Sequence, residues 1–350
     1  GFAAGAGAAA TTPPDWEIVH ELEHIALDEH GNTTTRREFT YRALTERGVA
    51  VVDEQRIRYH AGHGHLEDVQ AHTLKADGAR IEVPPTNVQV TSYDGIEGLP
   101  PAFSDYRVRR LVYPDVAVGD SVVLAYTLRA EPATFAGRHS TVHRFRDDVP
   151  THTAELIVSA PEAFGLHTLE YRLPPPATTA ADGRRQWRWT YRNPSATDHD
   201  DTSQLTRIWR DHELPMVLVS NFADHLAIAQ AYRATAAPKA VPTARVRELA
   251  ARLVAGIEPA RERAERLYEW VRDELDFAGN CLAGGDVVPR DTELVLNLRR
   301  GDCKDHATLL EALLASQGIV SEQVLIHSGN RYELTALPCW QSFNHVINYL

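Results

Sequence analysis

The first half of the chain alternates between apolar and polar residues with the two-residue period of β-strands. The alternation begins at Trp16 and continues in short runs to about Arg192. Gly, Pro, Asp and Asn gather between the runs, for example at residues 28–32 and 76–78, and mark turns. Short strands separated by such turns predict an all-β domain, an antiparallel sandwich or two packed sheets.

After Pro238 the apolar residues recur every three or four positions, which is the period of amphipathic helices. Thr243 is a suitable N-cap for a helix that ends at Gly256, and Pro259 suits the first turn of a second helix. Residues 292–298 would form a short third helix. The positions expected to be buried in the first two helices are Val246, Leu249, Ala250, Leu253, Ala260, Ala264, Leu267, Tyr268 and Val271.

These patterns divide the chain into four parts. They are a small-residue arm at residues 1–14, a β-sandwich-like domain at 15–195, a polar, proline-containing linker at 196–238 and an α+β domain at 239–350. The length of 350 residues, with 43% hydrophobic and 24% charged residues, is that of an ordinary soluble protein of two or three domains.

Charge and hydropathy exclude two classes of partner. With 36 basic against 48 acidic residues the net charge is −12, which argues against binding to nucleic acid or to an anionic membrane surface. No apolar run approaches the ~18 residues of a membrane span.

The first ten residues, G-F-A-A-G-A-G-A-A-A, resemble in composition the tail of a secretory leader and predict a periplasmic or secreted protein. The alternative is a flexible Ala/Gly arm, and in either case residues 1–14 should be disordered. The three cysteines, Cys281, Cys303 and Cys339, are too few for a disulfide framework. If Cys303 is a free thiol, the other two could pair, and the sequence leaves that open.

Residues 299–318, R-R-G-D-C-K-D-H-A-T-L-L-E-A-L-L-A-S-Q-G, predict a helix with a cysteine in its first turn. Asp302 is the expected N-cap, Cys303 the first helical residue and Asp305 a negative charge in the first turn. Gly318 ends the helix at the left-handed C′ position. The expected buried stripe is Ala307, Leu310, Leu313 and Leu314.

The helix start gives Cys303 the surroundings of a nucleophile. Free amide N–H groups and the positive end of the helix dipole favour thiolate over thiol, whereas the two aspartates oppose it. A base is therefore needed, and His345 follows 42 residues later (345 − 303) in the strand-like run S-F-N-H-V-I-N-Y. Because a structural thiol has no need of a helix start, we expect Cys303 and His345 to be nucleophile and base.

This order of motifs resembles the transglutaminase-like superfamily, in which a cysteine opens a helix and a histidine follows on a neighbouring strand. The matching segments are residues 301–305 with 309–310, 318–319, 324–326 and 343–346. The β-rich region resembles the N-terminal domain of unknown function that many bacterial transglutaminase-like proteins carry, through residues 76–78, 103–105 and 113–123. The resemblance implies a papain-like Cys-His-Asp core and no cofactor or metal.

The activity implied is acyl transfer on a peptide or carboxamide through a cysteine thioester. Water as the second nucleophile would make a protease or amidase and an amine would make a transglutaminase, and the motif favours neither. The backbone N–H of Cys303 would donate to the oxyanion, a contact worth about 3 kcal/mol. The β domain would bind a protein or glycan ligand if the core were only a scaffold, which is the alternative function.

Two residues of the family pattern have no counterpart here. The family's Asp lies a short strand beyond the His, but residues 346–350 contain no acid, so the third triad residue is unassigned and the core looks cut short at its C-terminal edge. The Trp that animal members place shortly before the Cys helix as an oxyanion donor is also missing, because no Trp lies between Trp270 and Trp340.

Two histidine patterns suggest metal binding. Residues 20–24, H-E-L-E-H, match the H-E-x-x-H motif of zinc metallopeptidases, which requires a helix. The segment reads as a strand, where His20 and His24 would stand about 13 Å apart, too far for one ion. Residues 60–65, H-A-G-H-G-H, are more simply a solvated glycine-rich loop. We therefore expect no metal site.

Overall fold

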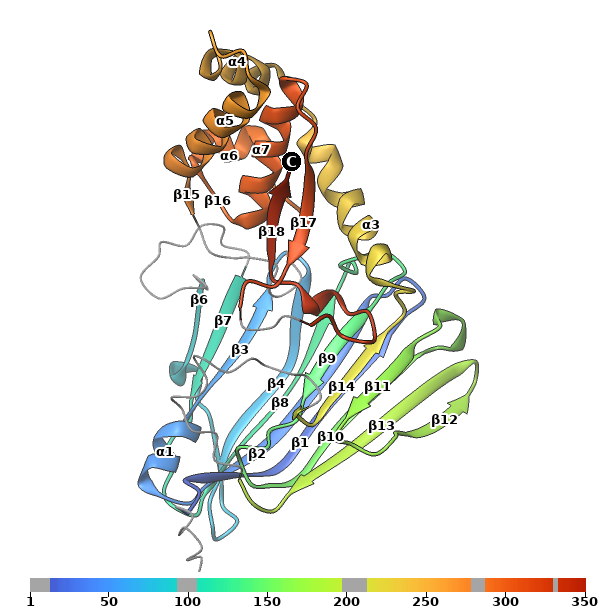
Figure 1. Ribbon diagram of the computed structural model, residues 1–350. Coiled ribbons are helices and arrows are strands. Elements are labelled where there is room, and N and C mark those ends of the chain that lie inside the picture. The colour runs from blue at the N-terminus through green and yellow to red at the C-terminus, as the bar shows by residue number, and fades with distance from the viewer. Residues whose placement is uncertain (1–12, 93–105, 197–212, 278–286, 330–332) are drawn as a thin grey trace, which may run out of the picture.

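A β-rich part and a helical part make up the protein (Figure 1). The computed structural model describes residues 13–92, 106–196, 213–277, 287–329 and 333–350. Most of the leader-like arm and Cys281 lie outside these residues, so the extracytoplasmic location and the pairing of Cys281 with Cys339 stay predictions. Among the helices described, none has both the length and the apolar character needed to cross a membrane.

An eight-stranded sheet forms the back of the β-rich part. Its strands, in spatial order, are β12 (Ala177–Ala181), β13 (Arg184–Asn193), β10 (Thr151–Pro161), β1 (Trp16–Leu27), β2 (Thr33–Ala43), β8 (Ser121–Ala130), β4 (Gly64–Leu74) and β5 (Arg80–Glu82). Neighbours run antiparallel except β1 and β10, which are parallel. The predicted antiparallel β architecture is confirmed, with this one parallel pair added.

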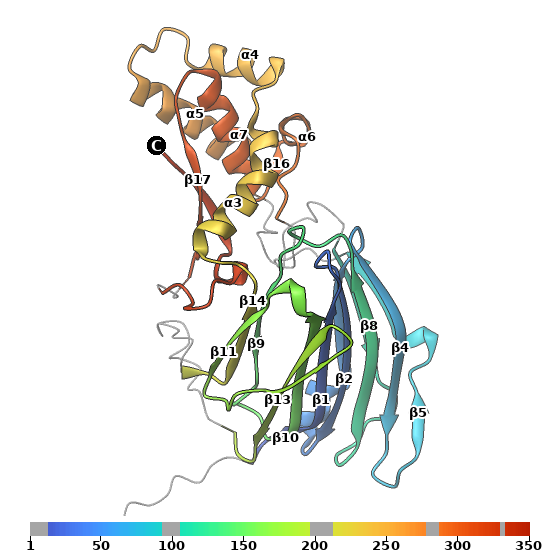
Figure 2. The same ribbon diagram turned by 90° about the vertical axis from the view of Figure 1, so that its right-hand side faces the viewer.

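Two three-stranded sheets form the second layer. One is ordered β3 (Glu54–His60), β7 (Tyr106–Val112) and β6 (Val88–Ser92), and the other β11 (His167–Tyr171), β14 (Met216–Ser220) and β9 (Ser140–Arg144). The short helix α1 (Glu46–Val52) packs beside β2. Figure 2 shows the second of these sheets lying over the large one.

Both small sheets pack on the same face of the large sheet. Leu156 of β10 and Leu124 of β8 point to the same face of the large sheet, because the pairing register across β1 and β2 puts both on that face. Leu156 lies in a buried cluster with Val217 of β14, and Leu124 lies in another with Ile57 of β3. The second layer is therefore split into two sheets above one continuous floor.

The region predicted as a linker, residues 196–238, contains two structural elements. Its residues Met216–Ser220 form β14, all five of them buried, at the centre of a small sheet. Its C-terminal part forms the helix α3 (His225–Ala236), capped by Asp224. Five successive buried residues are the pattern of a strand covered on both faces, and the polar, proline-containing surroundings hid that pattern.

The C-terminal part packs helices around a buried one. These helices are α4 (Ala244–Leu253), α5 (Ala260–Glu274), α6 (Thr292–Leu298) and α7 (Cys303–Ser316). Its strands are β15 (Asp276–Phe277), β16 (Arg300–Gly301), β17 (Glu322–Ile326) and β18 (His345–Tyr349). Leu309, Leu313 and Leu314 of α7 are fully buried in the main cluster of this part. Together with the β-rich first half, this arrangement confirms the predicted order of fold classes.

The predicted helix limits are largely confirmed. Thr243 caps α4 through its side chain, Pro259 precedes α5, and α6 covers the residues expected. The predicted face of α5 is wrong at Ala260, which is exposed, and at Tyr268, which is 51% exposed, whereas Trp270 is buried. The Trp270 ring also receives the guanidinium of Arg299 at 4.9 Å, so the larger aromatic surface is covered from both sides.

Candidate active site

Cys303 lies where the sequence predicted it, at the first position of α7. The Asp302 carboxylate accepts hydrogen bonds from the backbone N–H groups of Lys304 at 3.1 Å and Asp305 at 3.3 Å. The Asp305 carboxylate accepts one from the N–H of Asp302 at 3.2 Å, which completes a capping box. The cysteine is only 3% exposed. Local sequence therefore fixes the sulfur at the positive end of a helix that is buried along most of its length.

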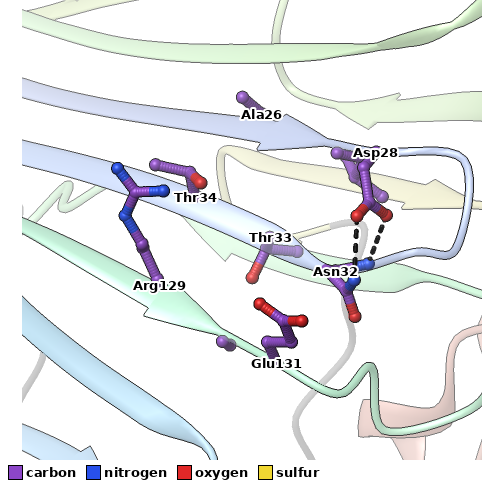
Figure 3. Close-up of a pocket in the computed structure, with 9 residues that line it drawn as sticks. Ala26, Asp28, Asn32, Thr33, Thr34, Arg129 and Glu131 are labelled. Atoms are coloured by element: carbon purple, nitrogen blue, oxygen red, sulfur yellow. Dashed lines mark hydrogen bonds between the residues drawn. The ribbon is translucent and has the colours of Figure 1, made fainter.

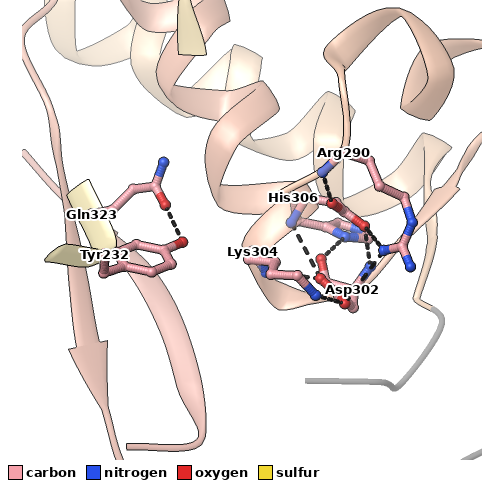
Figure 4. A network of polar contacts seen from close by, with 7 residues as sticks. Tyr232, Arg290, Asp302, Lys304, His306 and Gln323 are labelled. Carbon is pink, nitrogen blue, oxygen red and sulfur yellow. Dashed lines mark hydrogen bonds and ion pairs between the residues drawn. The ribbon is translucent and has the colours of Figure 1, made fainter. Parts of the chain in front are cut away.

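Two cations balance the two aspartates beneath the cysteine. Lys304 is fully buried and its ammonium pairs with the equally buried Asp302 carboxylate. Arg290 Nη1 lies 2.9 Å from Asp305 Oδ2 and 3.6 Å from Asp302 Oδ2 (Figure 4). The sequence suggested that the aspartates oppose the thiolate, but their charge is compensated within this cluster of Arg290, Asp302, Lys304 and Asp305.

Burial dominates the protonation of this cluster. It raises the pKa of Asp302 to about 7, with Lys304 acting to lower the pKa and the neighbouring Asp305 carboxylate acting to raise it.

The backbone at residue 301 leaves no room for a side chain. A Cβ on Gly301 would lie 2.7 Å from Cβ of Asp305, so glycine is required for the close approach that closes the capping box.

His345 opens β18, the strand that packs beside α7. Residues 317–321 join α7 to β17, and β17 pairs antiparallel with β18, so β18 runs in the same direction as α7 (Figure 1). Cys303 and His345 are each the first residue of their element and therefore lie at the same end of this packed pair. The structure brings together the two elements that carry the predicted nucleophile and base.

The face that β18 turns toward α7 is set by two other residues. Val346 is 3% exposed and shares a cluster with Cys303 and Ala307, and the Asn348 side chain donates to the carbonyl of Ala307 at 3.0 Å. By strand alternation the half-buried His345 ring points away from the face that Val346 and Asn348 turn toward α7. It lies at the end of β18 where α7 begins. Contact between this ring and the sulfur stays a prediction.

A second polar network, which the sequence did not reveal, joins α3, α7 and β17. The Tyr232 hydroxyl donates to Gln323 Oε1 at 2.7 Å (Figure 4), and the Gln323 amide donates to Glu311 Oε2 at 2.8 Å. Arg233 closes the network on Glu311 Oε1 at 2.5 Å. Tyr232 and Cys303 belong to the same buried cluster, and burial, followed by the charge of Cys303, raises the pKa of Tyr232.

The H-E-L-E-H segment lies on strand β1, so the helix that a zinc motif requires is absent from it. His24 contacts Ser159 Oγ at 3.2 Å. Glu23, on the other face, binds Arg37 at 2.6 Å and His143 at 2.9 Å. Among the residues that the structure describes, no group of three or more His, Cys, Asp or Glu is placed to hold a metal ion.

The histidine-rich segment 60–65 forms the connection between β3 and β4. The rings of His60 and His63 stack with their centroids 4.7 Å apart, and His60 Nδ1 accepts the N–H of Gly62 at 3.2 Å.

A separate hollow of about 230 Å³ lies at the turn after β1, where Asp28 accepts a hydrogen bond from the Asn32 side chain (Figure 3). Because that carboxylate also accepts the backbone N–H groups of His30 and Asn32, the turn uses its hydrogen-bonding capacity.

A larger cavity, of about 670 Å³, lies between the β-rich part and the C-terminal part. Phe135, Val287 and Trp340 line it, and the same three residues pack in the cluster that contains Cys303. Trp340 opens the turn Trp340–Ser342, which precedes β18. No local pattern in the sequence indicates that Phe135, from the β-rich part, packs in the cluster of the C-terminal cysteine.

Two family models match the chain. Residues 29–197 match the domain of unknown function DUF3857, for which a structure has been solved, and residues 247–342 match the transglutaminase-like superfamily. No curated protein matches the chain.

Among solved structures, a "putative protease" from Parabacteroides distasonis ATCC 8503 is similar over 95% of this chain, with a TM-score of 0.81 and 18% identity. The chain spans 65% of that protein's length. At this identity the likeness shows a shared fold.

Two further structures share much less of the fold. An M1 zinc metallopeptidase from Deinococcus radiodurans has a TM-score of 0.32 and 12% identity, over 59% of this chain and 42% of that one. Aminopeptidase A from Legionella pneumophila has a TM-score of 0.31 and 9% identity, over 60% and 22%. These scores are too low to bear on function. The C-terminal part therefore contains a transglutaminase-like domain at residues 247–342, and residues 29–197 of the β-rich part match the domain of unknown function DUF3857.

Proposed function

We propose that the protein catalyses thiol-dependent acyl transfer on peptide or carboxamide substrates, with Cys303 as nucleophile and His345 as base. The observation that carries the proposal is the placement of Cys303 at the capped start of α7, above a charge-balanced cluster, beside a strand that opens with His345. Family membership supports the same chemistry.

The reaction divides into two steps. The Cys303 sulfur bonds to the carbonyl carbon while the carbon–nitrogen bond breaks, and the thiol proton passes through His345 to the leaving amine. Water or a second amine then attacks the thioester, its proton returns through His345, and the sulfur leaves as the thiol. The backbone N–H of Cys303 is directed along the free end of the helix, where it would donate to the oxyanion. Hydrolysis and transamidation differ only in the second nucleophile.

The experiment is alkylation of the full chain with iodoacetamide across pH 5–9, with the modified cysteines identified by mass spectrometry. We expect Cys303 to react first at near-neutral pH, and the rate to fall at least tenfold in His345→Ala. His306→Ala is the matched control, because His306 lies on α7 with Nδ1 bonded to the carbonyl of Asp302 at 2.8 Å. Equal labelling of all three cysteines would contradict the proposal.

The alternative is a non-catalytic scaffold, and one observation favours it. The Cys303 side chain is almost fully buried, as a packing residue would be. A scaffold should label at Cys303 no faster than an ordinary exposed thiol and should show no dependence on His345. Incubation with a casein substrate and a fluorescent amine then separates hydrolysis, which releases peptides, from transamidation, which fixes the amine to the protein.

A further inference from the structure

We propose that the cavity between the two parts of the chain is the substrate site, and that it binds an extended peptide with a large apolar side chain close to the reacting carbonyl. This inference rests on the proposed function, since it assigns the substrate of the same thiol. The cavity measures about 670 Å³, a size that suits a short peptide segment.

Apolar side chains connect the cavity with the buried cluster that contains the thiol, although Cys303 itself does not line the cavity. Phe135, Val287 and Trp340 line its upper end and belong to the buried cluster of Cys303. The rings of Phe135 and Trp340 meet edge to face with centroids 6.2 Å apart. A substrate side chain seated against these rings would therefore lie against the cluster that contains Cys303.

The floor of the cavity is the inner face of the eight-stranded sheet. Ile25, Thr35 and Leu128 lie side by side on β1, β2 and β8, because Thr35 pairs with Ile25 on one side and with Leu128 on the other. Glu23 lines the cavity at the end away from the rings. Burial raises the pKa of Glu23, but His143 and Arg37 together lower it to about 2. Since both Glu23 oxygens are held by these partners, the far end offers an engaged carboxylate and the middle offers mainly apolar surface.

The side walls favour a polypeptide over other occupants. β3 contributes residues to the cavity and is a terminal strand of its small sheet, whereas the terminal strand β9 already gives the carbonyl of Ser140 to Gln341 Nε2 at 2.6 Å. Terminal strands carry backbone N–H and C=O groups on an open side, which an extended peptide can pair with and a glycan cannot match in register. The adjoining thiol acts on carbonyl groups, which also selects a peptide.

One wall residue has an unmet hydrogen bond. The His139 Nε2 atom is shielded from solvent and has no partner among the described residues, while the residue itself lines the cavity. Its backbone is fixed, because its N–H donates to Asn221 Oδ1 at 2.9 Å and its carbonyl accepts the N–H of Asn221 at 3.1 Å. Burial lowers the pKa of His139 to about 4, so the ring is neutral at pH 7. A peptide amide in the cavity would supply the missing partner.

The test compares two chloromethyl ketones that alkylate cysteine, acetyl-Ala-Ala-Phe and acetyl-Ala-Ala-Gly, on the full chain, with iodoacetamide as the small probe. We expect the Phe ketone to react with Cys303 at least tenfold faster than the Gly ketone, from burial of one aromatic side chain. Thr35→Trp fills the floor of the cavity and should abolish this preference, with the rate of each ketone divided by the iodoacetamide rate of the same variant. Thr40→Trp, five positions along the same strand and on its outer face, is the matched control and should retain the preference.

The outcomes separate the two proposals. An equal Phe preference in Thr35→Trp and wild type would overturn the cavity as the substrate site. If iodoacetamide shows that Cys303 is not reactive, the proposed function fails, and binding of dansyl-Ala-Ala-Phe-amide to Cys303→Ala still decides the cavity. Displacement of that peptide by an oligosaccharide and not by unlabelled peptide would also overturn the inference.

A second variant covers the case in which Thr35→Trp does not fold. His139→Leu should weaken binding of dansyl-Ala-Ala-Phe-amide roughly 3- to 10-fold, the effect of one hydrogen bond. Unchanged affinity in this variant would remove His139 from the site and, with Thr35→Trp unfolded, would overturn the assignment.

Discussion

Lys304→Met is the substitution on which the account of the cysteine helix depends most directly. It removes the cation that pairs with the fully buried Asp302, so this carboxylate either keeps its charge without that partner or takes up a proton, since burial already raises its pKa to about 7 and Lys304 acts to lower it. No solvent is available to screen that charge. The screening that limits the contribution of a surface ion pair to below about 1 kcal/mol therefore does not apply. Breaking a buried pair by removing one partner costs about 3–5 kcal/mol.

The expected result is therefore a loss of about 3–5 kcal/mol in the free energy of unfolding of the C-terminal part. Urea titration followed by tryptophan fluorescence would measure it, since Trp270 reports on this part. Arg261→Met is the matched control, because Arg261 and Glu265 form an ion pair whose side chains are 90% and 56% exposed. It should change the free energy of unfolding by less than about 1 kcal/mol.

The double variant Lys304→Met/Asp302→Asn tests the charge argument itself. Neutralising Asp302 restores the balance between Arg290 and Asp305, so the double variant should recover a large share of the stability lost in the single one. The same logic applies to reactivity, because the uncompensated charge in the single variant disfavours a thiolate at Cys303. A single variant within about 1 kcal/mol of wild type, or a double variant no better than the single one, would refute the reasoning.

Three further predictions concern the residues around this site and the floor of the cavity. Burial raises the pKa of Glu23, but the hydrogen bond with His143 helps to lower it to about 2. About 3 kcal/mol of stability should therefore be present above pH 4.5 and be lost as the pH falls toward 2. Acid unfolding of Glu23→Gln should lack this pH-dependent loss of stability. Gly301→Ala should lower Tm by several degrees in a calorimetric scan, because the new Cβ would meet Cβ of Asp305 at 2.7 Å, and an unchanged Tm would contradict the close approach. Asn348→Ala removes one hydrogen bond between β18 and α7, so it should lower the free energy of unfolding in urea by about 1 kcal/mol and slow the alkylation of Cys303. A loss of stability without slower alkylation would show that the position of β18 does not affect the reactivity of Cys303.

The helix that carries Cys303 could be predicted in full because its signals are local. Asp302, Asp305 and Gly318 act within one turn of the helix end they specify, through hydrogen bonds and backbone conformation that depend on near neighbours alone. The strand alternation of the first half is local in the same sense. Recognition of the superfamily depended on these short segments occurring in the right order.

The linker shows where local patterns fail. Residues 196–238 are polar and rich in turn-forming residues on average, yet Met216–Ser220 become the central strand of a small sheet. A strand gains its stability from partners far along the chain, here β9 and β11, and a search for polar segments does not reveal them. Burial of Lys304 was equally hidden, since a lysine in the first turn of a helix is expected at the surface.

The sequence by itself therefore determined the order of the two fold classes, the capped start of the helix at Cys303 and the strand that opens with His345. Only the tertiary structure placed Arg290 against Asp305, Tyr232 in one buried cluster with Cys303 and Phe135 of the β-rich part beside Trp340. The physical reason is one of range. Capping and alternation are set by hydrogen bonds within a few residues, whereas charge balance and cavity walls depend on packing between segments that the sequence separates by tens to hundreds of positions.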